Sequence, residues 1–115
     1  MNPQMTFLDR LKARQLSEVE YDGAKTIQAR FERFHKANPE VYTALRRLAL
    51  DLKAKGREKY GIKSLFEILR WHYAMATIGT EFKMPNEFTS RYARFLMEKE
   101  PELEDFFRTS VLRAP

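Results

Sequence analysis

The feature that most constrains this chain is a series of helix-length segments in which apolar residues recur every three or four positions. Such spacing places the apolar residues on one face of an α-helix. The clearest segment begins at Asn38-Pro39, because Asn caps helices and Pro suits the first helical position, and it ends by Gly56. Its core-facing stripe is expected to consist of Val41, Leu45, Leu48 and Leu52.

Two helices are predicted before this segment. The first covers roughly residues 3–20 and carries the near-helical apolar positions Phe7, Leu8, Leu11 and Leu16. The break at Tyr21-Asp22-Gly23 sets it apart, so residues 1–20 are expected to form a helical arm. Asp22 is a candidate cap for the second helix, which should end near Ala37. The stripe of that helix is Ile27, Phe31 and Phe34.

Two further helices are predicted after Gly56. Ser64 and Glu67 match a capping box, so one helix should run from Ser64 to about Thr77. Asn86 should cap the other, whose buried stripe is Phe88, Tyr92, Phe95 and Leu96. Pro101 should open a short helical turn. Residues 107–112 read as extended and could pair with the segment around Ile62 in a tiny sheet.

This order predicts a mainly α fold: a compact helical domain over residues 21–115, preceded by the arm. The succession of two short helices at residues 64–77 and 86–96 favours a helix-turn-helix core, or a truncated winged helix, within residues 39–113. A plain helical bundle is the alternative. The 115 residues suit one domain, and nine Phe, five Tyr and one Trp can supply a modest core.

The charge is unevenly distributed along the chain. Residues 1–63 carry 14 Lys/Arg and 8 Asp/Glu, a net of +6, whereas residues 64–115 carry 7 and 8, a net of −1. A basic side of this kind attracts phosphate, although it also fits an ordinary solvated surface. The candidate phosphate-binding residues are Arg46, Arg47, Lys53, Lys55, Arg57, Lys59 and Lys63.

The predicted helix after Asn86 has a polar and basic start. In a helix-turn-helix, the early residues of the second helix touch base edges, and Arg can grip guanine with two hydrogen bonds. We therefore expect base contacts from this start and phosphate contacts just before it. The alternative is that Arg91 and Arg94 pair with Glu87 and Glu98, each four residues away. The candidate residues are Lys83, Asn86, Thr89, Ser90, Arg91 and Arg94.

Catalysis and cofactor binding are not expected. His35 and His72 lie on different predicted helices with no metal-binding spacing, and His72 reads better as a packing histidine. Capping explains Ser64 without a nucleophilic role. There is no cysteine and no glycine-rich phosphate loop. With no long apolar run at the start or elsewhere, the predictions are no membrane, no cofactor, no metal and a cytoplasmic location.

A further expectation comes from Gly61 to Trp71, Glu81 to Asn86 and Ser90 to Arg94. These blocks resemble a family of small bacteriophage and prophage proteins, which commonly close with a stretch like Pro101 to Phe107. The likeness covers about residues 28–113. It implies a phage or mobile-element origin, with DNA binding or inhibition of a host protein as fitting roles, and it carries over no functional residue.

The sequence thus predicts a non-catalytic protein that binds double-stranded DNA in regulation, replication or recombination. The alternative is an inhibitor or modulator of a host protein or defence complex, acting through an acidic patch that mimics phosphate or meets a basic partner. A homodimer formed by the arm is compatible with both. The acidic patch consists of Glu98, Glu100, Glu102, Glu104 and Asp105.

Overall fold

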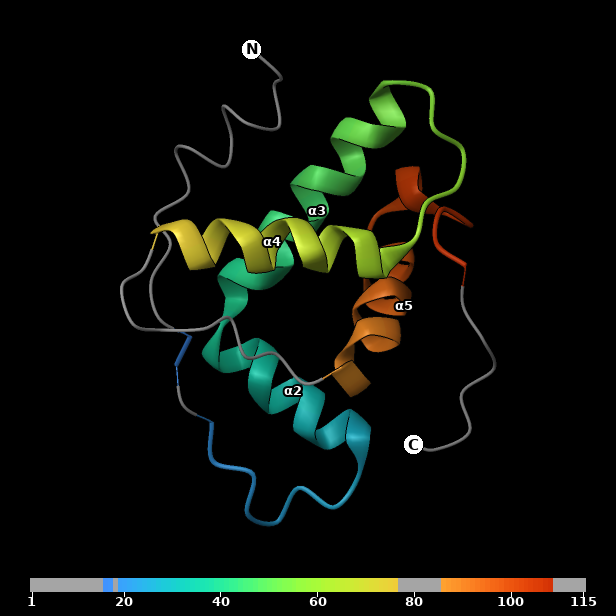
Figure 1. Ribbon diagram of the computed structural model, residues 1–115. Helices are drawn as coiled ribbons and strands as arrows, with labels where there is room; N and C mark the ends of the chain where they lie inside the picture. Colours follow the sequence, from blue (N-terminus) through green and yellow to red (C-terminus); the bar gives the residue numbers. More distant parts are fainter. Residues whose placement is uncertain (1–15, 18, 77–85, 109–115) are drawn as a thin grey trace.

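The computed structural model of the protein describes residues 16–17, 19–76 and 86–108 (Figure 1). The fold is mainly helical and compact, as predicted. It comprises α2 (Ile27–Ala37), α3 (Pro39–Ala54), α4 (Ile62–Ala76) and α5 (Thr89–Lys99), with the 3₁₀ turns η1 (Asn86–Phe88) and η2 (Pro101–Leu103). Within the described ranges, the only β pairing is an isolated bridge, so a winged-helix core is not confirmed. A helix-turn-helix core is not confirmed either, because residues 77–85, which would hold its turn, lie outside the described residues.

The first described residues form an irregular segment fastened to the bundle. Residues 16, 17, 19 and 20 are not helical, so the predicted arm helix does not extend to Glu20, and the rest of it lies outside the described residues. The break at Gly23 is confirmed as a turn with a left-handed φ of 82°. Arg33 holds this turn by donating to the backbone carbonyls of Glu20 and Asp22 at 2.9 and 2.6 Å.

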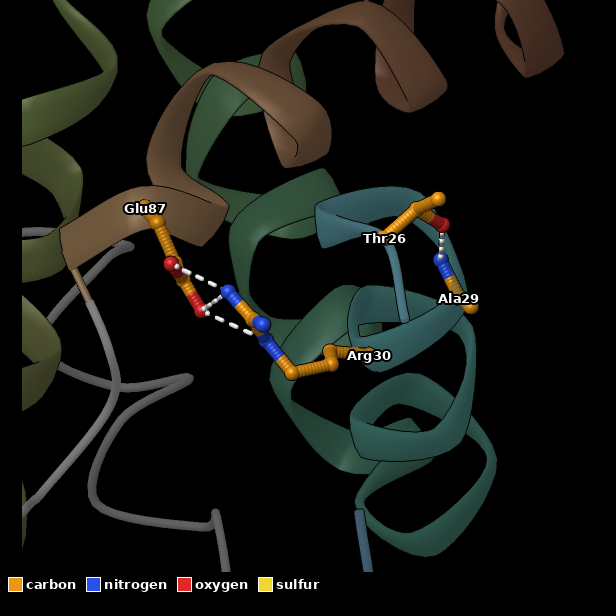
Figure 2. A network of polar contacts seen from close by, with 4 residues as sticks. All are labelled: Thr26, Ala29, Arg30 and Glu87. Atoms are coloured by element: carbon orange, nitrogen blue, oxygen red, sulfur yellow. Dashed lines mark hydrogen bonds and ion pairs between the residues drawn. The ribbon is translucent and has the colours of Figure 1, made fainter. Parts of the chain in front are cut away.

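Helix α2 begins at a different cap from the one predicted. The hydroxyl of Thr26, and not the carboxylate of Asp22, accepts a hydrogen bond from the Ala29 N–H at 3.0 Å (Figure 2). Because a side-chain oxygen three residues before an N–H satisfies one of the orphan donors of the first turn, Thr26 fixes where the helix starts.

The corner between α2 and α3 depends on a fully buried Asn38. Pro39 occupies the first position of α3 as predicted, but the Asn38 side chain makes no capping bond. Its Oδ1 instead accepts from the Ser17 N–H at 2.7 Å, while Nδ2 lies 3.4 Å from the carbonyls of Ser17 and Phe34. Asn38 therefore joins the incoming chain to the corner.

Helix α3 ends as the sequence predicts. Gly56 has a φ of 93°, and the Arg57 N–H donates to the Leu52 carbonyl while the Gly56 N–H donates to the Lys53 carbonyl. This pair of bonds is the Schellman arrangement, in which a left-handed residue satisfies the last carbonyls of a helix. The chain then turns sharply toward α4.

The connector to α4 is pinned by the C-terminal segment. Tyr60 forms a parallel bridge with Phe107, and the Tyr60 N–H donates to the Phe106 carbonyl at 3.0 Å. The predicted pairing of these two segments is found only as this single bridge, and at Tyr60 instead of Ile62, because α4 already begins at Ile62; the predicted extended residues 109–112 lie outside the described residues. Ser64 therefore lies inside the first turn of α4, and the predicted capping box is wrong.

The core lies where α2, α3, α4 and α5 meet (Figure 1). Tyr92 of α5 lies edge-on to Phe31 of α2 at 4.7 Å and to Phe66 of α4 at 5.8 Å between ring centroids. Such edge-to-face pairs stabilise the core beyond the burial of their area. The predicted stripes of α3 and α5 face this core, although Leu52 and Phe95 are only partly buried.

Candidate nucleic-acid interface

Helix α5, the predicted recognition helix, is embedded in the bundle. Every residue from Thr89 to Met97 is buried or half-buried, and full exposure begins only at Glu98. It packs against α4, α3 and η2. A helix that enters the major groove needs an exposed face. The predicted start of this helix is also shifted, since Asn86 opens the 3₁₀ turn η1 and α5 begins at Thr89.

The prediction that Arg91 is turned away from the core and available to DNA is wrong. Its exposure is 6%, and its Nη1 donates to Oε1 of Gln28 in α2 at 3.0 Å. The prediction assumed that only the apolar stripe of α5 is covered by the rest of the protein. Because α2 covers the adjacent side, Arg91 is enclosed between the two helices. Its long methylene stem packs while the guanidinium keeps a hydrogen-bond partner.

The other predicted residues of this group differ in placement. Thr89, Ser90 and Arg94 are half-buried. The Thr89 hydroxyl donates to the Asn86 carbonyl at 2.9 Å, which links α5 to η1. The Nε of Arg94 is buried, with no hydrogen-bond partner in the described part of the chain. Lys83 lies outside the described residues.

A salt bridge fastens η1 to α2. The Arg30 guanidinium donates to both carboxylate oxygens of Glu87 at 2.8 to 3.1 Å (Figure 2). Two-pronged contacts of this kind define the relative orientation of their partners. Glu87, which the sequence offered as a partner for Arg91, thus holds the entry to α5 against α2.

Two of the residues predicted to contact phosphate, Arg46 and Arg47, pair with acids of the protein itself. The Arg46 Nε donates to the Glu100 carboxylate at 2.6 Å, and Arg47 pairs with Asp51 at 3.1 Å. The Tyr42 hydroxyl also donates to Glu100 at 3.2 Å. Burial, together with the nearby negative charge of Glu100, raises the pKa of Tyr42 to about 12. Glu100 therefore joins α3 to the end of α5.

The remaining predicted cations form a group that we call the basic connector: Lys53, Lys55, Arg57, Lys59 and Lys63. All five side chains are exposed, and none forms an ion pair with an acid in residues 16–17, 19–76 or 86–108. The Schellman turn at Gly56 and the Tyr60–Phe107 bridge determine the path of this segment. It is the part of the predicted site that the structure leaves most available to an anion.

Arg108 joins the basic connector and was missed by the sequence reasoning. It is exposed and directly follows Phe107, whose bridge with Tyr60 places it beside the start of α4. The predicted pairing of this tail with the Ile62 segment was the signal that could have found it. Three acids of the same two segments, Glu58, Glu104 and Asp105, are also exposed.

Three predicted site residues meet at a cavity beside α4. Lys63 lines it from α4, and Asn86 and Thr89 line it from the start of the η1–α5 unit. The cavity holds about 560 Å³, which is within the range of small-ligand sites. The complete lining is Lys63, Phe66, Glu67, Arg70, Asn86 and Thr89.

The acidic patch is divided. Glu98, Glu102, Glu104 and Asp105 are exposed, whereas Glu100 is engaged with Arg46 and Tyr42. Asp105 adopts a left-handed φ of 59°, which Asp tolerates better than most residues. Across the described residues, no three His, Cys, Asp or Glu side chains gather as a metal site would require.

The two histidines lie among aromatic rings. His35 is half-buried and contacts Phe95 and Tyr42 at 5.1 and 5.5 Å between ring centroids, and burial lowers its pKa. His72 is half-buried beside Tyr73. Its Nε2 has no hydrogen-bond partner among the described residues, so the packing role is only partly satisfied.

The fold and surface define a small, mainly helical protein with a basic connector at one corner of the bundle. Searches against family models, curated proteins and solved structures return no match for this chain. The resemblance to phage proteins therefore stays a prediction. Among the described helices, none has the length and apolar character that crossing a bilayer requires.

Proposed function

We propose that this protein is a non-catalytic DNA-binding protein that holds the phosphate backbone through its basic connector. The observation that carries the proposal is the exposure of five cations within eleven residues, without acidic partners in the described part of the chain. Such a cluster raises the local concentration of a polyanion and releases counterions on binding. Arg108 enlarges the same corner.

A standard helix-turn-helix protein inserts its second helix into the groove, which here would be α5. The proposed mode does not use α5 in this way. The burial of Arg91 argues against insertion of α5 into a groove, so α5 serves as the support. Contacts would instead come from the basic connector and from the start of α4, where Lys63 also lines the cavity shared with Asn86 and Thr89. A role in phage or mobile-element regulation, replication or recombination rests on the sequence resemblance alone.

The test is fluorescence anisotropy of a labelled DNA duplex titrated with the full chain over a salt series. The double variant Lys55→Gln/Lys59→Gln removes two connector charges. Each phosphate contact contributes about 0.9 to the slope of log affinity against log salt for duplex DNA. We therefore expect the slope to fall by roughly 1.8. The matched control is Lys25→Gln/Lys36→Gln, which removes two exposed charges elsewhere.

Equal slopes for both double variants would mean that net charge, and not the connector, drives binding. No measurable binding at low salt would reject the DNA-binding proposal outright.

The second candidate function is binding of a basic host protein through the acidic patch. The exposed positions Glu98, Glu102, Glu104 and Asp105 favour it. The variant Glu102→Lys/Glu104→Lys should then abolish partner capture from host extract while leaving the circular dichroism spectrum unchanged. Retained capture by this variant would remove the patch from consideration.

A further inference from the structure

The outer face of α4 exposes two large apolar side chains. Trp71 is 58% exposed and Met75 is 70% exposed, and they are the large hydrophobic residues most exposed in the described part of the chain. They lie one helical turn apart and therefore share a face. An indole that is more than half exposed contributes little to the core, so its place on this face calls for a different explanation.

Cations lie beside this face, whose start adjoins the basic connector; Arg70, the residue before Trp71, is turned about 100° away from it round the helix. Lys63 lies at the start of α4 and belongs to that connector, while Arg70 precedes Trp71 and pairs with Glu67. From Lys63 to Trp71 the distance along the helix axis is about 12 Å. Lys63 and Arg70 also line the cavity between α4 and the start of α5.

This combination matches the chemistry of unpaired nucleic acid. Proteins that hold single strands combine a positively charged path for the backbone with aromatic side chains on which bases stack. Two exposed apolar side chains are too few for a stable protein interface, which buries about 800 Å² on each partner. The neighbouring cations also favour an anionic ligand over an apolar protein surface.

We propose that Trp71 stacks on an unpaired base of a DNA strand whose phosphates contact the basic connector. This inference rests on the proposed function and names its preferred ligand as single-stranded DNA or an unpaired region. Duplex DNA would then bind through the phosphates alone, because its bases are not free to stack on an external ring.

The experiment uses the only tryptophan of the chain as the reporter. The full protein is titrated with an oligothymidylate, with a duplex of equal length, and with inorganic polyphosphate, which carries charge but no bases. We expect the single strand to quench the Trp71 fluorescence, and the duplex and polyphosphate to leave it nearly unchanged. Quenching by polyphosphate as strong as that by the oligonucleotide would overturn the stacking inference.

Affinity for a labelled oligothymidylate is then measured for three variants by anisotropy. Trp71→Ala should lose roughly 5- to 150-fold in affinity, the range for removal of one stacked base. Trp71→Phe keeps an aromatic face and should retain most of the affinity. Met75→Ala is the matched control on the same face and should have little effect. Both side chains replaced are exposed, so circular dichroism should show intact folds for all three variants.

The outcomes separate the two proposals. If single-stranded and duplex DNA both bind with a steep salt dependence while Trp71→Ala leaves the affinity for oligothymidylate unchanged, the stacking inference is wrong and the DNA-binding proposal stands. Equal losses for Trp71→Ala and Met75→Ala would indicate apolar docking and likewise overturn stacking. If neither nucleic acid binds at low salt, both proposals fail.

Discussion

Arg91 provides the sharpest test of how the molecule is built, because its burial and its predicted DNA contact have opposite consequences. It is enclosed between α5 and α2 and donates to Gln28 at 3.0 Å. A hydrogen bond made by a charged group contributes about 1.5 to 3 kcal/mol. Truncation to Ala also removes two buried methylenes, at about 0.8 kcal/mol each. We therefore expect Arg91→Ala to lower the free energy of unfolding by about 3 to 4.5 kcal/mol.

Two companion variants separate packing from hydrogen bonding. Arg91→Met keeps most of the apolar stem and should cost only about 2 kcal/mol, the share of the lost hydrogen bond. In a double-mutant cycle, Arg91→Met and Gln28→Ala should couple by about 1 to 2 kcal/mol. The measurement is urea denaturation followed by circular dichroism. The exposed Arg57→Met in the connector is the control and should change stability by less than about 0.5 kcal/mol.

DNA affinity completes the test. A base-contacting arginine would lose roughly 5- to 150-fold in affinity when replaced. A buried Arg91 should change affinity by less than about twofold once the folded fraction is taken into account. Unchanged stability combined with a large loss of DNA affinity would refute the structural role given to Arg91 and restore α5 as a recognition helix.

Three further predictions concern the fold. Asn38→Ala should cost about 1 to 2 kcal/mol and speed hydrogen exchange at the Ser17 amide, whose acceptor is lost; an unaltered exchange rate would contradict the tether. Gly56→Ala should cost about 1 kcal/mol by denaturation, since a φ of 93° strains any side chain although open space surrounds this one; a stabilised variant would refute it. His35 has a lowered pKa, so the unfolded chain binds its proton more readily and stability should fall as pH drops below about 6.5. His35→Phe should remove that part of the pH dependence in denaturation curves, and an unchanged curve would show that His35 does not cause it.

Local signals in the sequence predicted most of the fold. Asn38-Pro39, Gly56 and Pro101 correctly marked the start of α3, its end and the turn η2, because caps and breakers act over a few residues. The same locality explains the errors at Asp22 and Ser64. In each case a nearby residue could start the helix equally well. Which residue does so depends on contacts with distant parts of the chain, and a short stretch of sequence does not show these contacts.

The candidate site was predictable only where exposure follows from local sequence. A run of cations beside a glycine stop is solvated in almost any fold, and the connector is indeed exposed. The burial of Arg91 depends on Gln28, 63 residues earlier in the chain, so helical periodicity could not reveal it. Arg108 could be predicted only from the knowledge that the bridge between Phe107 and Tyr60 brings the C-terminal segment back to the connector.

The placement of α5 explains why a basic helix start does not by itself make a DNA-reading surface. The Arg30–Glu87 bridge fastens η1 to α2, and the Arg91–Gln28 bond repeats that attachment one turn later. Arg30 thus acts across the contact of α2 with η1, and Arg91 across the contact of α2 with α5. A helix held in this way cannot enter a groove without breaking two polar contacts. Trp71 of α4 carries no such restraint, since it is 58% exposed and lies about two helical turns from Lys63 of the connector. For this reason the helix that precedes the predicted turn, and not the one that follows it, is where a nucleic acid should meet the protein.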